Sequence, residues 1–369
     1  MAPVRHAMIQ PRPENNLFDG TVDAFDKTSK NFLFQPPASP AFLGGGTAEY
    51  SQAAIVQEAV RNAGEIENKG IEFTLNSRNI QSKNFTWSTT LIFSHYSNKV
   101  ISLDGFPPIT EQVGSGGGSL ITVSRTAVGG PLGEFYGYEV QGIVSTQAQL
   151  DYLAAHPQNV TGAPSIVTSD RTIANGVYLG DLEYKGNNNG APNTLYNLGN
   201  PNPDFIYSIG NNFTYMGFNL SVFLTGQYGG KILNALEFQT EGLDGLYSNQ
   251  LAAAGNYWTP TNQNTNIPSP RATFGNNNLV MSDRFLESAS YLRLQTVRLG
   301  YNLPSKWARV VMMSRVNVFA SGQNLYVFTK YNGLDPEIGF ANQNVLLQNI
   351  DNGRYPIPRV ITFGLNAEF

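Results

Sequence analysis

The residues that could do chemistry in this chain are few and scattered. None of the 369 residues is a cysteine, so there is no thiol nucleophile, cysteine zinc site or disulfide. The three histidines, His6, His95 and His156, lie far apart in the sequence. Asp335 and Glu337 stand close together in the segment GLDPE, where a loop is expected. Because no Ser–His–Asp set or catalytic carboxylate pair stands out, we predict that the protein is not an enzyme.

Metal and phosphate sites have equally little support. The segment 180–190 (GDLEYKGNNNG) faintly resembles a calcium loop, but only Asp181 and Glu183 are acidic there, and calcium prefers several spaced carboxylates. The run SGGG at 115–118 lacks the Lys-Ser/Thr of a phosphate loop. We therefore predict neither a metal nor a cofactor.

Composition excludes further classes of protein. Only 14% of the residues are charged, against roughly 25% in an ordinary soluble domain, and the aromatic content of 12% argues against disorder. A net charge of -4 argues against a nucleic-acid binder that neutralises phosphates. No window of 18 consecutive apolar residues predicts a transmembrane helix. These exclusions leave a weakly charged protein that is rich in Gly and Asn, and we expect it to be all-β.

Alternation of apolar and polar residues is the clearest structural pattern. At the end of the chain, Ile361, Phe363 and Leu365 alternate with small or polar residues. The same pattern predicts strands near 17–29, 68–80, 84–100, 204–215, 217–230, 285–301, 314–329 and 356–369. Two further spans, near 133–144 and 177–185, would keep the chain running alternately up and down and give about ten strands. The apolar parity shifts between Leu294 and Val297, which predicts a β-bulge.

The polar side of these strands carries Ser, Thr, Asn, Gln and Gly rather than many Lys and Glu. Apolar residues toward lipid and small polar residues toward a wet lumen are typical of a transmembrane barrel. Short connections (80–83, 216–217 and 304–306) alternate with long ones (30–68, 102–131, 232–283 and 330–354). Outer-membrane barrels show this asymmetry between periplasmic turns and external loops. The sequence therefore predicts an all-β, antiparallel transmembrane β-barrel of the cell outer membrane, with an irregular segment at 1–16 and the barrel part at 17–369.

Aromatic residues have two interpretations. In strands, Tyr and Trp are expected to form the girdles at the membrane interfaces. In the long segments, Tyr196, Tyr247, Tyr257 and Trp258 are candidates for contact with a ligand. The N-terminal residues 1–16 contain no apolar run of 7–15 residues and are not expected to be a secretory signal peptide.

Several segments together resemble the C-terminal part of SusC/RagA-type, TonB-linked outer-membrane transporters. The segments that carry the resemblance are 22–34, 68–103, 128–144, 199–232 (GNPNPDFIYSIG onward), 288–304, 315–338 (RVNVFASGQNLYVFTKYNGLDPEI) and 355–369 (YPIPRVITFGLNAEF). Phe369 closes an alternating strand together with Phe363 and Leu365. It looks like the signal that such barrels present to the barrel assembly machinery.

The resemblance implies a barrel of about 22 strands, a plug domain and a SusD-like outer-membrane lipoprotein lid. It also implies import of bulky nutrients, oligosaccharides (glycans) or peptides, with energy from the TonB–ExbB–ExbD complex. The chain departs from the family because no signal peptide, TonB-contacting segment or plug is recognised, and about half the strands are found. We therefore expect the C-terminal half of a transporter. Relatives also carry an Asp-rich loop where Asn and Gly stand at 180–190.

The edges of such a sheet lead to a structural prediction. Lipid does not tolerate unpaired backbone groups, so part of a wide barrel must pair with a complementary half or close on itself. We expect an open curved sheet or a strained small barrel. The alternative is a soluble, secreted all-β carbohydrate-binding or structural module, in which a two-sheet sandwich would bury the apolar faces. An outer-membrane lipase or protease would need a catalytic cluster that the sequence lacks.

Overall fold

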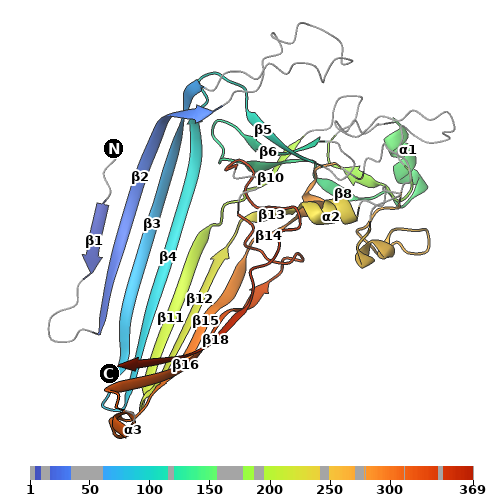
Figure 1. Ribbon diagram of the computed structural model, residues 1–369. Coiled ribbons are helices and arrows are strands. Elements are labelled where there is room, and N and C mark those ends of the chain that lie inside the picture. Colours follow the sequence, from blue (N-terminus) through green and yellow to red (C-terminus); the bar gives the residue numbers. More distant parts are fainter. Residues whose placement is uncertain are drawn as a thin grey trace.

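A long antiparallel sheet dominates the computed structural model, and folded loops lie at one end of it (Figure 1). The structure describes residues 5–9, 17–34, 61–114, 120–155, 178–186, 195–241, 249–270, 278, 280–310, 312–339 and 344–368. Within these residues, no helix is both long and apolar enough to cross a membrane.

The long sheet, which we call the wall, has nine strands in the order β1-β2-β3-β4-β11-β12-β15-β16-β18. All of its neighbouring strands are antiparallel. Their bounds are Arg5–Ile9 (β1), Phe18–Phe34 (β2), Arg61–Gln81 (β3), Phe85–Ser102 (β4), Phe205–Tyr215 (β11), Phe218–Tyr228 (β12), Tyr291–Asn302 (β15), Arg315–Thr329 (β16) and Val360–Glu368 (β18).

The remaining elements, apart from one helix, lie in the long connections, whose described parts we call the cap. Three small sheets form there, with the orders β10-β7-β6-β5, β14-β13-β17 and β8-β9. The cap strands are Ile109–Gly114 (β5), Leu120–Thr126 (β6), Glu134–Gly137 (β7), Val140–Ile143 (β8), Leu182–Tyr184 (β9), Tyr196–Gly199 (β10), Lys231–Asn234 (β13), Leu286–Ser288 (β14) and Ile350–Asp351 (β17). The helices are Gln147–Ala155 (α1), Ala235–Thr240 (α2), Ala252–Asn256 (η4) and Asp283–Phe285 (η5), with Ser305–Val310 (α3) at the opposite end of the wall.

Short turns and long loops lie at opposite ends of the wall, as the sequence predicts. Residues 82–84 join β3 to β4, Met216 and Gly217 join β11 to β12, and the segment with α3 joins β15 to β16. These turns and the end of β18 lie at the bottom of Figure 1, whereas the cap lies at the top. Met216 and Gly217 both have positive φ, 45° and 92°, which a two-residue hairpin turn of this kind requires.

The two faces of the wall keep their chemistry from strand to strand. In one cross-strand row, Val22 pairs with Phe73, Phe73 with Phe93, and Phe93 with Tyr207. In another, Leu220 pairs with Leu299, Leu299 with Ala320, and Ala320 with Phe363. Register is therefore fixed so that the apolar residues of successive strands share one face, which we call the apolar face.

Aromatic rings gather near both ends of the apolar face. Toward the turns, the paired rings are Phe85 and Tyr215 (centroids 6.4 Å apart), Trp87 and Phe213 (5.7 Å), and Phe218 and Tyr301 (4.5 Å). Toward the cap, they are Phe93 and Phe205 (5.3 Å), Phe205 and Tyr228 (5.1 Å), and Tyr326 and Phe328 (4.7 Å). The length of β11 corresponds to roughly 34 Å along the strand, or about 26 Å of membrane depth at the usual tilt of a barrel strand.

The predicted bulge is confirmed in β15. Leu294 pairs with Leu224 and Thr296 with Phe223, so Gln295 is the extra residue. The neighbouring strand β16 adjusts with it, because Tyr326 and Gln323 are the partners of Leu294 and Thr296.

The prediction that ten strands form the wall is wrong for two segments. Strand β4 pairs directly with β11, so the segments 133–144 and 177–185 do not enter the wall. They form β7, β8 and β9 of the cap instead, and none of these has more than 4 residues. Such strands are too short to cross a bilayer, which takes about 9–11 residues. Within the segment 1–16, which the sequence predicts to be irregular, the structure describes residues 5–9, and these form β1 and pair with β2.

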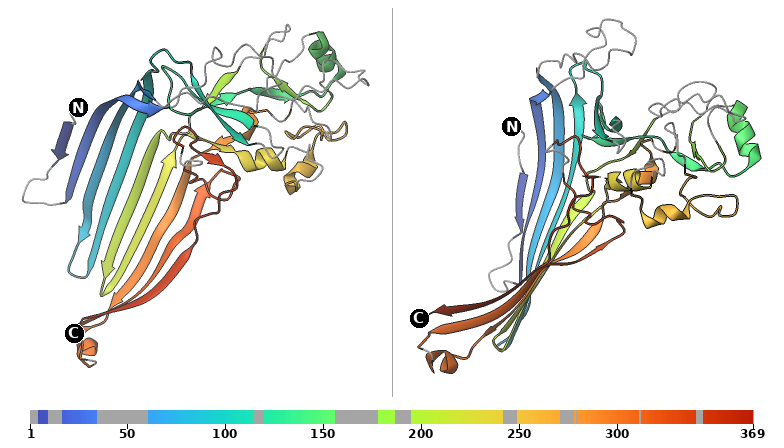
Figure 2. Two further views of the ribbon diagram at one scale, coloured as in Figure 1. Left: turned by 45° about the horizontal axis from the view of Figure 1, so that its top comes forward. Right: turned by 45° about the vertical axis from the view of Figure 1, so that its right-hand side comes forward.

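The wall is open and curved, as expected, with β1 and β18 as its edges (Figure 2). The small sheets all lie in the cap, so no second sheet covers the apolar face among the described residues. Val100 and Val316 are the buried apolar side chains of the described wall strands. A two-sheet sandwich would instead bury a whole face of each sheet. This arrangement favours the membrane interpretation over the soluble module.

The hydrophobic core lies in the cap. Its largest cluster joins β5, β6, β7, β13, α2 and β17 through Val113, Val123, Phe135, Leu233, Phe238 and Ile350, together with Phe285 of η5. Phe238 and Phe285 pack edge to face with ring centroids 4.9 Å apart. The long loops are therefore a packed body and not independent strings of residues.

Adjacent residues of β11 test which face of the wall meets lipid. Ile209 lies on the apolar face, opposite Leu91 and Leu224, whereas Ser208 lies on the polar face and donates to Thr225. We expect Ile209→Arg to destabilise the inserted barrel by about 2–4 kcal/mol, because an arginine near the bilayer midplane loses its hydration. The measurement is the folded fraction in lipid vesicles, by the heat-dependent gel shift of the full-length protein.

Ser208→Arg is the matched control, since it adds the same side chain one residue away. It should leave the folded fraction close to that of the unchanged protein. A larger loss with Ser208→Arg than with Ile209→Arg would show that the faces are assigned the wrong way round.

Candidate functional site

A row of hydroxyl and amide side chains crosses the polar face of the wall. Each pairs with the next from β4 to β18, except that the charged Arg298 stands between Ser221 and Ser321. The row consists of Ser88, Asn212, Ser221, Ser321 and Thr362. The Ser221 hydroxyl donates to Asn212 Oδ1 over 2.7 Å. Neutral groups of this kind exchange hydrogen bonds with water or with a polar solute. The face suits a wet lumen.

The polar face carries a positive charge near the β18 edge of the wall and negative charges near the β1 edge. The Arg298 guanidinium lies 4.1 Å from the centroid of the Phe319 ring, which holds its planar group in place. On the other side, Asp23 pairs across the sheet with Glu72, and Asn76 donates to the Asp19 carboxylate over 3.0 Å. The polar face therefore carries charges of both signs.

A buried ion pair fastens the last loop to the wall. Arg293 of β15 is 1% exposed, and its Nη2 lies 2.6 Å from Asp335 Oδ1 and 3.3 Å from Glu337 Oε2. The sequence placed these two acids in a loop but gave no sign of their partner. Removing one member of a buried pair leaves an uncompensated charge, so this contact fixes where the 330–339 segment runs.

Asn349 joins three of the long loops. Its side-chain amide donates to Pro201 O over 2.7 Å and to Lys231 O over 3.2 Å. Its carbonyl accepts from Leu233 N–H over 2.9 Å. The residue is buried and has a φ of 55°, a conformation that asparagine tolerates better than most residues. The residues around 201, 232 and 349 are thereby held together above the wall.

Acidic groups meet beside α2 in the cap. Burial, followed by the nearby Glu241 and Glu287 carboxylates, raises the pKa of Glu237 to about 7. Arg284 offsets part of this charge, since its Nη2 lies 2.7 Å from Glu241 Oε2. Further along the chain, burial and the hydrogen bond to Asp351 raise the pKa of Tyr331 above its usual range. The buried bond from Tyr331 to Asp351 joins two segments of the cap.

The predicted ligand-contact residues are distributed over different parts of the cap. Tyr196 of β10 is half-buried, and Lys185 Nζ lies 4.9 Å from its ring centroid. Tyr257 is half-buried next to η4, whereas Trp258 is only 3% exposed and packs beside Gly180. Tyr247 lies outside the described residues. Tyr196 and Tyr257 have surface to offer a ligand, and the Trp258 ring serves the packing of its loop.

The predicted assembly residues lie on the edge strand β18. Phe363 and Leu365 are 79% and 61% exposed, respectively. Phe369 itself lies outside the described residues. An edge strand with exposed apolar side chains is a surface that another strand can join.

Asp181 of the 180–190 segment has hydrogen-bond partners in the cap. Asp181 is buried, and its carboxylate accepts from Tyr178 N–H and Asn278 Nδ2. Over the described residues, no group of three or more His, Asp or Glu side chains could hold a metal ion. His95 lies at the cap end of the apolar face, where its ring contacts the carbonyl of Asp204.

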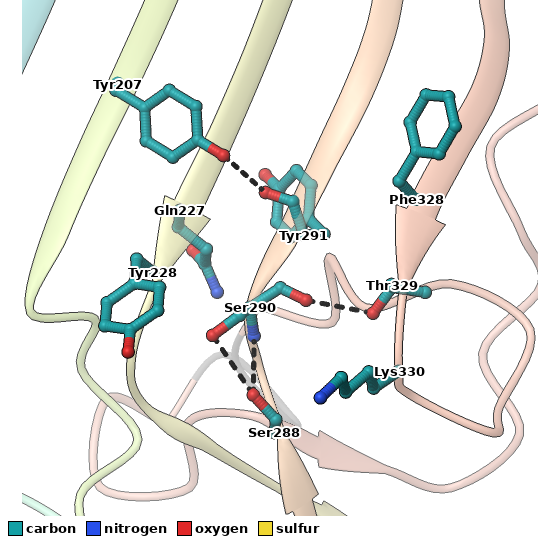
Figure 3. Close-up of a pocket in the computed structure, with 9 residues that line it drawn as sticks. All are labelled: Tyr207, Gln227, Tyr228, Ser288, Ser290, Tyr291, Phe328, Thr329 and Lys330. Carbon is teal, nitrogen blue, oxygen red and sulfur yellow. Dashed lines mark hydrogen bonds between the residues drawn. The ribbon is translucent and has the colours of Figure 1, made fainter.

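A pocket of about 330 Å³ opens at the cap end of β12, β15 and β16. We call it the rim pocket, and it is lined by Tyr207, Gln227, Tyr228, Ser288, Ser290, Tyr291, Phe328, Thr329 and Lys330. Figure 3 shows the rings of Tyr207 and Phe328 at one end, and Ser288, Ser290 and Lys330 at the other. The Tyr207 hydroxyl donates to Tyr291 O over 3.4 Å. This ring can lie flat because residue 226 is glycine, where a Cβ would come within 2.8 Å of it.

Comparison with known proteins places the chain in a family. The model of the family "TonB dependent receptor-like, beta-barrel" matches residues 13–200. TonB-dependent receptor P3 of Formosa agariphila is 32% identical over 359 residues, which are 96% of this chain and 33% of that protein. TonB-dependent receptor SusC of Bacteroides thetaiotaomicron is 25% identical over 331 residues, which are 85% of this chain and 27% of that protein.

Solved structures agree on the fold. The RagAB peptide transporter superposes with a TM-score of 0.68 at 20% sequence identity, over 96% of this chain and 34% of that one. The chain thus spans about a third of the length of the proteins it matches. Its open nine-stranded wall accordingly corresponds to part of a wider barrel. The matching model, together with the two-faced wall and its asymmetric connections, shows that the chain belongs to the TonB-dependent receptor family and forms part of its β-barrel.

Proposed function

We propose that this chain forms part of the barrel of an outer-membrane, TonB-dependent active transporter that imports bulky nutrients. The observation that carries the proposal is the two-faced wall, with an apolar and aromatic face suited to lipid and a weakly charged polar face suited to a lumen. The family consists of receptors and transporters, and no enzymatic step is proposed.

The transported solute, in this proposal, is an oligosaccharide (glycan) or a peptide. Hydroxyl and amide groups on the polar face can bond to either class, and the charges of both signs also suit a peptide. The structurally similar RagAB is a peptide transporter, and this similarity favours a peptide as the solute. Tyr196 and Tyr257 of the cap are the proposed aromatic contacts for the substrate.

The proposed partners follow from the resemblance to SusC/RagA-type transporters. A SusD-like outer-membrane lipoprotein would cover the cap as a lid, and the TonB–ExbB–ExbD complex would supply energy through parts of the transporter that precede the barrel. The core of the cap supports the first contact, because loops packed together offer a lid a firm surface. The edges of the wall, β1 and β18, would pair with the strands that complete the barrel.

Uptake in living cells tests the proposal. Deleting the gene of the full-length protein should prevent growth on the transported oligosaccharide or peptide. The same deletion should abolish accumulation of that nutrient in the cells. Deleting the TonB gene should have the same effect, because active import needs energy from the inner membrane. The measurement is uptake of fluorescently labelled oligosaccharide and peptide pools.

Membrane fractionation of the same cells supplies the control. Recovery of the protein from the soluble extracellular pool without detergent would refute the transporter and support a secreted module. Uptake that persists without TonB would refute active transport of this type.

Aromatic truncation tests the proposed substrate contacts. Tyr196→Ala and Tyr257→Ala should each weaken binding of the transported solute by about 1 kcal/mol or more, which is roughly fivefold, if the ring stacks on it. Isothermal titration of the full-length protein in detergent measures this affinity. Tyr215→Ala is the matched control, because Tyr215 lies on the apolar face at the turn end. Equal affinities for the three variants and the unchanged protein would show that neither Tyr196 nor Tyr257 contacts the substrate.

The C-terminal residue tests the proposed assembly signal. Phe369→Ser should reduce the amount of protein inserted in the outer membrane several-fold, since Phe369, Phe363 and Leu365 would together dock on the barrel assembly machinery. Asn366→Ser, on the polar face of the same strand, is the control and should insert normally. The measurement is the folded band in outer-membrane fractions, and equal insertion of the two variants would contradict the assignment.

A further inference from the structure

We propose that the rim pocket binds the phosphorylated headgroup of an outer-leaflet membrane lipid. The inference depends on the apolar face meeting lipid and is independent of which nutrient is carried. It rests on the position of the pocket, on the charge of Lys330, on hydroxyl groups beside it, and on the apolar half of the pocket.

The pocket stands where the apolar face ends. Tyr207 and Leu292 both pair with Gly226 of β12, and Leu292 pairs with Phe328, so these residues form one cross-strand row. Ser290 and Lys330 each lie one residue beyond the last pair of β15 and β16, Tyr291 with Thr329. Together with Tyr228 of β12, they continue the same face toward the cap. On β15 and β16, this step leads from Leu292 and Phe328 to the polar side chains of Ser290 and Lys330. In a bilayer, this is the level of the headgroups.

Lys330 differs from Lys69 and Lys30, which lie on the same face of the wall. Lys69, two residues from Ile71 of the apolar face, lies 2.8 Å from Glu67 and 3.4 Å from Asp26. Lys30 lies 3.3 Å from Glu65 in the same way. Lys330 is exposed, and it has no carboxylate within 4.0 Å in the part of the chain that the structure describes. The structure therefore leaves this ammonium group available to an external anion.

Hydroxyl groups supply further donors at the same end. Ser290 Oγ accepts from Gly229 N–H over 3.0 Å and from the Ser288 hydroxyl over 3.1 Å. Both of these contacts use its lone pairs, so its own hydrogen can be donated to a ligand oxygen. The Lys330 side chain points toward this serine pair in Figure 3. An ammonium group and a hydroxyl that converge in this way fit the oxygens of a phosphate.

The other half of the pocket is apolar and continues into the membrane band. Phe328 is 56% exposed, and the Tyr207 ring lies flat over Gly226. Below them, Tyr326 and Leu294 form the next row of the apolar face. A free phosphate ion would gain nothing from these surfaces, whereas the glycerol or sugar and the first acyl carbons of a lipid would cover them. The amphipathic lining therefore points to a lipid as the source of the phosphate.

Short-chain lipids that differ only in the phosphate test the proposal. The full-length protein in detergent should bind dihexanoyl phosphatidic acid more tightly than dihexanoylglycerol, as measured by native mass spectrometry. Lys330→Gln should weaken the binding of phosphatidic acid about fivefold and leave the binding of dihexanoylglycerol unchanged. Lys330→Arg should restore it, because the charge returns at the same place.

Lys306→Gln is the matched control, since it removes the same charge from α3 at the turn end of the wall. Equal weakening by Lys306→Gln and Lys330→Gln would overturn the proposal, as would equal binding of the two lipids by the unchanged protein. Inorganic phosphate distinguishes the source of the anion. If it displaces phosphatidic acid at equal concentration, the pocket takes free phosphate and the lipid assignment is wrong. These outcomes do not depend on nutrient uptake or on TonB.

Discussion

The structure depends on one constraint, which is that lipid offers no hydrogen bonds to a peptide backbone. Each strand of the wall must therefore find its donors and acceptors in its neighbours, and eight successive antiparallel pairings provide them from β1 to β18. Once the backbone is satisfied in this way, the apolar side chains need no protein partner, since the membrane is their solvent. This is why large residues such as Phe218 and Phe363 remain exposed while the sheet is regular.

The same constraint moves the hydrophobic core out of the main sheet and into the loops. The cap stands beyond the apolar band, so its backbone can bond to water, and its side chains must bury one another. Phe135, Phe238 and Phe285 do so, and Asn349 fills the backbone bonds that the meeting loops leave open. The Arg293 pair then couples the cap to the polar face of the wall. A cap that is packed and anchored can present a defined surface above a lumen.

The sequence predicts most of the wall because alternation directly records which side chains share a face. Eight of the nine wall strands and the bulge at Gln295 follow from that pattern. The pattern fails in the cap, where Tyr138 and Tyr184 also alternate with polar residues but bury their rings in loop packing. The buried ion pair of Arg293 could not be predicted from the sequence for a related reason. The partner of Arg293 is the distant Asp335, and nothing in the local spacing of β15 reports a partner 42 residues away.

The edges of the wall show why this sheet calls for further strands. Strand β18 has 9 residues and pairs on one side only. About half of its backbone groups, or roughly four N–H and four C=O, therefore point away from the sheet. At several kcal/mol for each unpaired group in hydrocarbon, one bare edge would cost roughly 20–40 kcal/mol. That exceeds the roughly 5–15 kcal/mol by which folded domains are stable. In a bilayer, both edges of the wall must therefore be paired, which agrees with a chain that spans about a third of the length of the proteins it matches.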